Sequence, residues 1–205
     1  MKYFLASELD HEEISLLLSR GWRKFGIYYF IPECVDCHGC IPVRIPVRDF
    51  SPSKSQKRVL KKNSSTRVSF GPINYSDRAY DIYRLHSKER FGTESEPADF
   101  VQGFYQPSCP SLQSEYYAGG ELAAIGYLDK GSDCLSSVYF IFDPSCSDMS
   151  LGTLSIIREI EYACELGLEY YYLGYYVPGC SRMAYKGQFY PREFFDWEKG
   201  IWARG

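Results

Sequence analysis

Residues 115–175 contain the order of patterns that most restricts the fold of this chain. Two strand-like runs on either side of a Gly-Gly pair predict a β-hairpin over residues 115–128. An apolar strand over residues 135–142 follows, and an aromatic strand covers residues 169–175. Between them, the stretch from Ser150 has one apolar side with helical spacing, formed by Ile156, Ile157, Ile160, Ala163 and Cys164. Hairpin, strand, helix and strand together predict an α+β domain.

The first half of the chain predicts shorter elements. A helix is expected to begin at Asp10, because an Asp cap with Glu13 three residues later is typical of a helix start. Residues 22–31 are expected to form one aromatic strand, and residues 76–91 a helix. The polar loop 92–99 is the expected boundary between halves. We therefore divide the chain into residues 1–72, residues 73–99 and residues 100–205.

A concentration of positive charge lies inside the first half. The whole chain of 205 residues has a formal net charge of -3. Between residues 44 and 67, one acid, Asp49, stands against eight cations: Arg44, Arg48, Lys54, Lys57, Arg58, Lys61, Lys62 and Arg67. A helix would place several of them along one side. Such a stripe suits the phosphates of RNA, and it is also typical of an ordinary solvated helix face.

Three cysteines at two-residue spacing precede the basic stretch. Cys34, Cys37 and Cys40 form a CxxCxxC pattern, with Gly39 allowing a tight bend. This spacing suits thiolates that converge on zinc or an iron–sulfur cluster, although three ligands are one short. The alternative is a set of reduced, partly buried thiols.

Composition narrows the class of protein. Hydrophobic residues make up 45% and charged residues 24% of the chain, as in soluble globular proteins. No apolar run is long enough to span a membrane, and the first residues lack the apolar core of a signal peptide. Eight cysteines without an export signal indicate reduced thiols, so we expect a cytoplasmic protein.

Several motifs carry a resemblance to a known family. They are CxxCxxCIPVRIPV (34–47), SPSKSQKRVLKKN (51–63), SSVYFIFDP (136–144), SLGTLSIIREIE (150–161) and YYLGYYVPGCSRMAYKGQFYP (171–191). In this order they resemble the aminoacyl-tRNA–protein transferases of the N-degron pathway, which include bacterial aspartate/glutamate leucyltransferases and arginyltransferases. The resemblance spans residues 15–202. Family members usually have an upstream segment with a further cysteine, and this chain begins after the corresponding place.

The resemblance implies an acetyltransferase-like (GNAT-type) mixed sheet with packed helices and a second, smaller α/β half at the N-terminus. It also implies transfer of an amino acid from charged tRNA to the α-amine of proteins that begin with Asp or Glu, which marks them for degradation. Leucine is the favoured donor, and arginine is the alternative, because Gly187 is typical of arginyltransferases. The expected partners are charged tRNA and these proteins, with neither a membrane nor DNA.

The reaction needs no cofactor and no covalent intermediate, because the donor is already an activated ester and an α-amine, with a pKa of about 7.7–8, is partly nucleophilic near neutrality. The site must align the amine with the carbonyl and stabilise the oxyanion. We expect Tyr139, Tyr175 and Tyr185 to orient the ester or relay a proton. Arg44, Arg58 and Lys186 are the candidates for binding the acidic side chain. The expected contacts of tRNA are Lys54, Gln56, Lys57, Lys61, Asn63 and the helix start at Ser150 and Gly152.

Two functions of other classes remain as alternatives. A non-catalytic tRNA- or RNA-binding protein would use the cysteines as a zinc knuckle and residues 54–67 as a phosphate-binding patch. A small-molecule acetyltransferase would bind coenzyme A at the helix start, although SLGT lacks the fuller glycine-rich loop of such enzymes.

Overall fold

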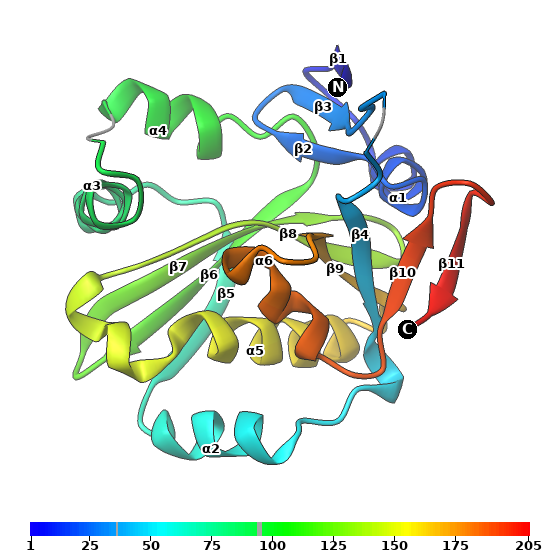
Figure 1. Ribbon diagram of the computed structural model, residues 1–205. Coiled ribbons are helices and arrows are strands. Elements are labelled where there is room, and N and C mark those ends of the chain that lie inside the picture. Colours follow the sequence, from blue (N-terminus) through cyan, green and yellow to red (C-terminus); the bar gives the residue numbers. More distant parts are fainter. Residues whose placement is uncertain (36, 94–95) are drawn as a thin grey trace.

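The computed structural model describes residues 1–35, 37–93 and 96–205, and these form a three-stranded and an eight-stranded sheet with helices on both faces of the larger one (Figure 1). The strands are β1 (Lys2–Leu5), β2 (Arg23–Phe25), β3 (Tyr28–Ile31), β4 (Ile41–Pro46), β5 (Arg67–Pro72), β6 (Ser111–Ala118), β7 (Glu121–Lys130), β8 (Cys134–Phe142), β9 (Tyr170–Tyr176), β10 (Glu193–Asp196) and β11 (Ile201–Arg204). The α-helices are α1 (His11–Ser19), α2 (Lys54–Lys62), α3 (Asp77–Phe91), α4 (Pro97–Phe104), α5 (Leu151–Glu165) and α6 (Ser181–Ala184). Three 3-10 turns complete the described elements: η1 (Val47–Asp49), η2 (Pro144–Met149) and η3 (Tyr185–Gln188).

The larger sheet has the strand order β11-β10-β4-β9-β8-β7-β6-β5. Its neighbouring strands are antiparallel except for β8 and β9, which are parallel and joined through α5. A parallel pair needs such a crossover, whereas antiparallel neighbours can be joined by a tight turn. The expected α+β class with an acetyltransferase-like mixed sheet is therefore confirmed.

Local sequence explains the central elements. Gly119 and Gly120 have φ values of 60° and 91°, which suit the two-residue turn of the β6–β7 hairpin, and this hairpin was expected. Helix α5 packs on one face of the sheet and α2 packs on α5 (Figure 1). Helices α3 and α4 cover the opposite face near β7 and β8. Both faces are apolar at these contacts: Val43, Ile45, Ile156, Ile157 and Ile160 lie in one core, and Ile82, Phe100, Phe104, Ile125 and Ile141 lie in the other.

The single strand expected over residues 22–31 is wrong. Gly26 has a φ of 57°, a conformation open to glycine, and the chain turns there to form β2 and β3 as an antiparallel hairpin. Strand β1 pairs with the other edge of β3, which gives the small sheet the order β1-β3-β2. The aromatic run correctly predicted β-strand conformation, but its pattern did not indicate the turn at Gly26.

Strands from both expected halves share the larger sheet. Strand β4 lies between β9 and β10, and β5 forms an edge beside β6. The expected connecting loop 92–99 already contains the first turn of α4, and residues 94–95 within it lie outside the described residues. In the part of the chain that the structure describes, no helix has the length and hydropathy of a membrane span.

The parallel pair separates soon after it begins. Its ladder comprises only Cys134–Tyr170, Leu135–Tyr171 and Ser136–Tyr172. Just beyond, the register of β8 against β7 shifts, and the register of β9 against β4 also shifts. Bulges of this kind bend strands and redirect their side chains. The two strands therefore diverge, and the gap between them opens into the candidate site.

Candidate active site at the split between β8 and β9

A cavity of about 910 Å³ lies where β8 and β9 separate. Residues 137–140 of β8 and 173–175 of β9 form two walls. The start of α5, the α6–η3 segment, the end of α3 and the β2–β3 hairpin supply the rest. The cavity has the size of a small-ligand site. Segments far apart in sequence thus meet in one place.

The charges around this cavity have one sign. Its described lining residues include no Asp or Glu, and the cations are Arg23, Lys24, Arg90, Arg182 and Lys186. Lys24 is neutralised by a buried ion pair with Asp129, with a distance of 3.1 Å between Nζ and Oδ1. The others have no ion-pair partner among the described residues. An excess of positive charge in a partly enclosed space favours an anionic ligand.

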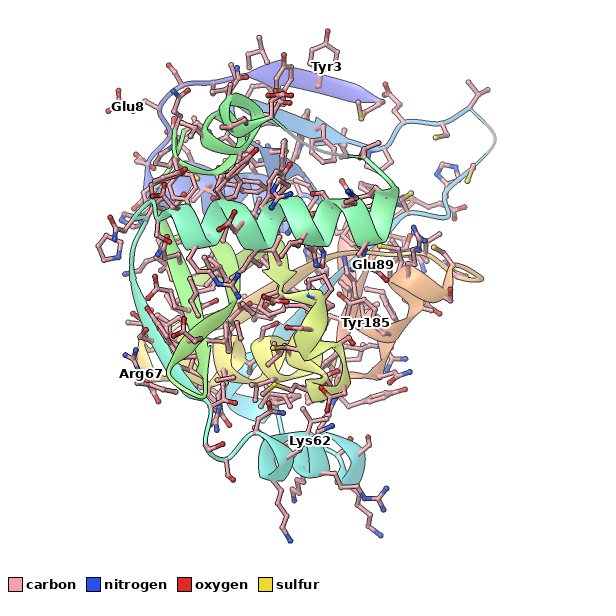
Figure 2. The ribbon with its side chains drawn as sticks, turned by 90° about the vertical axis from the view of Figure 1, so that its left-hand side faces the viewer. Tyr3, Glu8, Lys62, Arg67, Glu89 and Tyr185 are labelled. Carbon is pink, nitrogen blue, oxygen red and sulfur yellow. The ribbon has the colours of Figure 1, made fainter. Side chains whose placement is uncertain are left out.

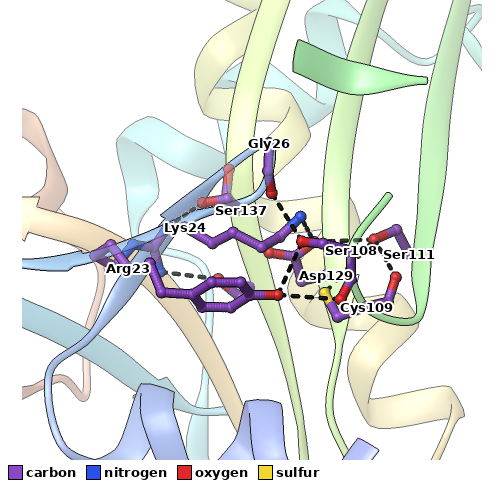
Figure 3. A network of polar contacts seen from close by, with 10 residues as sticks. Arg23, Lys24, Gly26, Ser108, Cys109, Ser111, Asp129 and Ser137 are labelled. Carbon is purple, nitrogen blue, oxygen red and sulfur yellow. Dashed lines mark hydrogen bonds and ion pairs between the residues drawn. The ribbon is translucent and has the colours of Figure 1, made fainter. Parts of the chain in front are cut away.

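Arg23 and Lys24 fasten the small sheet to the large one (Figure 3). The Arg23 guanidinium donates to Ser136 Oγ at 2.8 Å and to the carbonyl oxygen of Ser137. Both acceptors lie on β8 at the point where β9 departs. Burial lowers the pKa of Arg23, but a guanidinium keeps its proton in proteins. The sequence analysis missed Arg23. The sign of its role is that Arg23 and Lys24 stand together within an aromatic strand, where buried cations need polar partners.

Lys186 lies on η3, and its ammonium group lies close to Gly174 of β9. Gly174 has a φ of 92°, and a Cβ there would stand 3.1 Å from Lys186 Nζ and 3.5 Å from Arg23 Nη2. Glycine thus lets both cations lie against the strand. Burial, together with the charges of Arg23 and Arg90, lowers the pKa of Lys186 to about 7. Lys186 therefore changes charge near neutral pH.

The three expected tyrosines all line the cavity. Tyr139 packs on Phe104, with ring centroids 5.4 Å apart, and burial raises its pKa. The Tyr175 hydroxyl donates to the carbonyl oxygen of Gly21 at 3.2 Å. Tyr185 is labelled on the α6–η3 side in Figure 2. The hydroxyls of Tyr139 and Tyr185 have no hydrogen-bond partner among the described residues, so they are available to a ligand.

The start of α5 also faces the cavity. Ser150 and Gly152 both line it. Ser150 has a φ of 58°, and its side chain caps no backbone group. A Cβ on Gly152 would meet nothing within 4 Å. The first N–H groups of a helix have no intrahelical acceptor, so an anion can approach them at this end.

Basic helix α2 adjoins the segment that leads to this helix start. Lys62 Nζ lies 3.1 Å from Asp148 Oδ2, and Asn63 Nδ2 donates to the carbonyl oxygen of Met149 at 2.9 Å. The remaining cations of the helix, Lys54, Lys57, Arg58 and Lys61, are exposed. Figure 2 shows side chains of this helix extending into solvent, with Lys62 labelled. The basic surface of α2 therefore lies beside the η2 segment, which ends directly before the cavity-lining Ser150.

Two polar residues expected to contact tRNA are buried. Gln56 is 5% exposed; its Oε1 accepts from the backbone N–H of Ser53 at 2.8 Å, and its Nε2 donates to the carbonyl oxygen of Gln188 at 3.2 Å. Asn63 is 1% exposed and ends α2. Their amides hold α2 against η3 and η2, so we do not carry them forward as contacts of tRNA.

Two of the three cations expected to bind the acceptor lie outside the cavity lining. Arg44 Nε donates to Glu193 Oε2 at 2.8 Å, and its guanidinium lies 3.6 Å from the Tyr170 ring centroid and 4.4 Å from that of Trp202. This partnered, stacked arginine holds β10 beside β4. Arg58 points into solvent from α2. Only Lys186 of the three lines the cavity.

The cysteines do not assemble a metal site in the described part of the chain. Cys34 and Cys37 are exposed, and Cys40 is partly buried. The described residues contain no group of three or more His, Cys, Asp or Glu side chains that could hold a metal ion. The zinc or iron–sulfur cluster expected at Cys34, Cys37 and Cys40 therefore receives no support from these residues.

A buried carboxyl group lies on α5 behind the cavity wall. Glu159 is 1% exposed; it accepts from Ser114 Oγ at 2.9 Å and from the Tyr171 hydroxyl. Burial raises its pKa to about 7. The sequence analysis missed this residue too, although it lies three residues after Ile156 and four before Ala163, on the apolar side of the helix.

Comparison with known proteins identifies the family. Residues 2–58 match the N-terminal region, and residues 78–196 the C-terminal region, of the family described as arginine-tRNA-protein transferase. The second match covers more than half of the chain. The chain belongs to this family. Its expected class, an aminoacyltransferase enzyme that uses a tRNA and a protein, is confirmed.

Several curated relatives of the transferase have a more specific name. The transferase is 33% identical over 187 residues to the aspartate/glutamate leucyltransferase of Thiobacillus denitrificans, and the match covers 89% of this chain and 78% of that one. It is 35% identical over 202 residues to the enzyme of the same name from Alcanivorax borkumensis, covering 97% and 81%. Among solved structures, L-PGS from Bacillus licheniformis is similar with a TM-score of 0.52 and 14% identity. That match covers 87% of the transferase and 55% of L-PGS, so it concerns the fold alone.

Proposed function

We propose that the transferase moves leucine from the 3′ ester of its tRNA to the α-amine of proteins that begin with Asp or Glu. The observation that carries this proposal is the cavity at the β8–β9 split, with four unpaired cations and no acid among its described lining residues. The relatives named aspartate/glutamate leucyltransferase support the choice of both substrates. An acidic first residue supplies the negative charge that such a cavity favours.

Lys186, Arg23 and Arg90 bind the acceptor's carboxylate in this proposal. Arg23 and Lys186 both lie against Gly174, so one carboxylate group can accept from both. Arg90 is exposed at the end of α3 and reaches the cavity from its rim. Lys186 retains its expected role, while Arg23 and Arg90 take the place of Arg44 and Arg58.

The tRNA approaches from the side of α2. The exposed cations Lys54, Lys57, Arg58 and Lys61 neutralise backbone phosphates, and the terminal nucleotide reaches the start of α5 at Ser150 and Gly152. The hydrogen bond from buried Asn63 to the carbonyl oxygen of Met149 holds this surface next to the helix start. The 3′ ester then lies beside the acceptor amine.

The walls of the cavity favour leucine over arginine. Its apolar lining residues include Phe30, Val138, Phe140, Leu173 and Met183. These residues suit the isobutyl side chain of leucine. A guanidinium from an arginyl donor would face the unpaired cations of the cavity and be repelled by them. The arginyl alternative from the same family therefore ranks second.

The reaction requires alignment and proton transfer. The α-amine attacks the ester carbonyl carbon, a new C–N bond forms, and the bond from that carbon to the ribose oxygen breaks. The amine loses a proton and the ribose hydroxyl gains one. Tyr139 and Tyr185 have free hydroxyls for this transfer, and Tyr175, which is hydrogen-bonded to Gly21, orients the ester.

Transfer of radiolabelled leucine and arginine, in separate reactions, to peptides that begin with Asp, Glu, Asn or Ala tests the proposal. Asn is the matched control, because it has the shape of Asp without its charge. We expect leucine to be transferred to the Asp and Glu peptides and at least tenfold more slowly to Asn. Equal use of Asp and Asn would refute the role of the cations. Transfer of arginine alone would establish the arginyl alternative.

A Lys186→Met variant and the remote Lys199→Met control complete the test. The first should lose most of its preference for Asp over Asn, and the second should keep it.

A further inference from the structure

One face of the small sheet is apolar and exposed. Tyr3, Leu5, Tyr28 and Phe25 are 60%, 55%, 52% and 42% exposed. They share a face because Leu5 pairs with Tyr28, Tyr28 with Phe25, and Tyr3 lies two residues before Leu5. The opposite face is buried: Tyr29 is 0% exposed and stacks on Phe4. At β2 the exposed side also contacts the rest of the molecule, because Phe25 packs on Phe104 of α4 with ring centroids 5.3 Å apart, whereas Tyr3, Leu5 and Tyr28 extend beyond this contact. We call this side of the small sheet the aromatic face.

The aromatic face is continuous with the cavity. Phe30 lies on it opposite Tyr3 and next to Arg23, and Phe30, Arg23 and Phe25 all line the cavity. The Phe30 ring also contacts Tyr175, with centroids 6.4 Å apart. On the other side of Phe30, the rings of Tyr3 and Tyr28 lie 6.4 Å apart. Aromatic side chains on this face thus extend from the cavity wall at Phe30 to Tyr3 on the outer strand β1, where Tyr3 is the strand partner of Phe30.

The aromatic face and the basic helix lie at opposite ends of the molecule. Figure 1 shows the small sheet above the β8–β9 region and α2 below it. Figure 2 places Tyr3 at the top, Lys62 at the bottom and Tyr185 of the cavity between them. The two substrates are macromolecules whose reacting ends meet in the cavity, so the rest of each must extend out of it. The basic end suits the tRNA, which is a polyanion. The aromatic end is left for the polypeptide.

We infer that the aromatic face binds the segment that follows the acidic first residue of the acceptor, in extended conformation and with a preference for apolar side chains. The inference rests on the proposed function, because it needs the first residue in the cavity. From β2 to β1 the face crosses two strand spacings, about 10 Å in all, which about three extended residues span. Residues 2 to 4 of the acceptor would thus cover it.

Three acceptor peptides test the inference: Asp-Gly amide, the apolar Asp-Leu-Phe-Leu-Gly and the polar Asp-Ser-Asn-Ser-Gly. The double variant Tyr3→Ser, Tyr28→Ser removes two exposed rings, and Tyr75→Ser removes a ring that is 42% exposed elsewhere. For the unmodified chain we expect a KM about tenfold lower for the apolar than for the polar pentapeptide. In the double variant this ratio should fall to about two, with unchanged KM values for Asp-Gly amide and charged tRNA. Tyr75→Ser should retain the ratio.

Four results would overturn the inference: equal KM values for both pentapeptides, a ratio that survives in the double variant, a raised KM for charged tRNA in that variant, or a dimer of the unmodified chain that the double variant converts to monomers. The third result would assign the face to RNA and the fourth to self-association. Absence of transfer to Asp-Gly amide would instead be a failure of the proposed function. The two failures are therefore distinguishable.

Discussion

Lys186 is the residue whose chemistry depends most on its surroundings. A lysine in water has a pKa of about 10.4, and in the cavity burial and two neighbouring arginines lower the pKa to about 7. A bound carboxylate favours the ammonium form and raises the pKa again. Binding of an acidic residue is therefore coupled to proton uptake above pH 7.

This coupling predicts weaker binding of the acceptor as pH rises. An N-acetylated Asp peptide keeps the carboxylate and has no α-amine to titrate. We expect its affinity, measured calorimetrically, to fall about tenfold between pH 6 and pH 8, because the free protein must take up a proton at the higher pH. Lys186→Met should bind weakly at both pH values. The same pH dependence in this variant would contradict the assignment.

Glu159 predicts a pH dependence of folding stability. Its pKa rises from 4.5 in the unfolded chain to about 7 in the folded one, so the native state binds more protons between these values. The contribution of the protonated carboxyl is fully present below pH 4.5 and is lost as pH rises through about 7, for a total of about 3 kcal/mol. Glu159→Gln, which stays neutral, should lack this loss. Urea unfolding at pH 5 and pH 8 measures this loss in both proteins. An equal change in the free energy of unfolding between the two pH values for both proteins would refute the prediction.

At the scale of elements, the start of α5 has backbone N–H groups without intrahelical acceptors and open space beside Gly152. Gly152 has no neighbour within 4 Å of its missing Cβ, and its φ is not in the left-handed region. Packing therefore does not require glycine here. The requirement we propose is space for the tRNA end.

Gly152→Ala separates stability from binding. The variant should be as stable as the unmodified chain or about 0.5 kcal/mol more stable, because alanine favours helix. Its KM for charged tRNA should rise several-fold, since the added methyl group faces the ligand. Gly71→Ala, which adds a methyl group in open space on β5, is the matched control. An unchanged KM in Gly152→Ala would exclude close approach of tRNA at this turn.

At the scale of the whole molecule, the cavity lies between a basic and an aromatic end, so both substrates can be bound at once. Direct attack needs no acyl-enzyme. Cys180 lines the cavity with a free thiol, which would be the nucleophile if the reaction passed through a covalent intermediate.

We therefore expect sequential kinetics. Initial rates measured against both substrates should give intersecting lines, and Cys180→Ala should retain activity within about threefold. Parallel lines, together with loss of activity in Cys180→Ala, would establish a covalent intermediate at that thiol.

Local sequence was sufficient for most elements and for several site residues. Hairpin turns, helix caps and apolar periodicity are decided by neighbouring residues, so the β6–β7 hairpin, α3 and α5 could be predicted. The motifs around Tyr139, Ser150 and Lys186 also carried the family resemblance. Tyr139 lies in the expected strand β8, Ser150 lies at the expected start of α5, and Lys186 follows β9 in the chain; the structure brings all three to one cavity.

Tertiary structure alone decided which cations face the cavity. Arg44 and Arg58 belong to the stretch with the most positive charge, yet one is stacked between aromatic rings and the other points into solvent. Arg23, in a strand that looked continuous, reaches the cavity because Gly26 turns the chain. Charge patterns count residues along the chain, whereas the field in a cavity depends on which side chains long-range packing leaves unpaired. That pairing is a property of the fold.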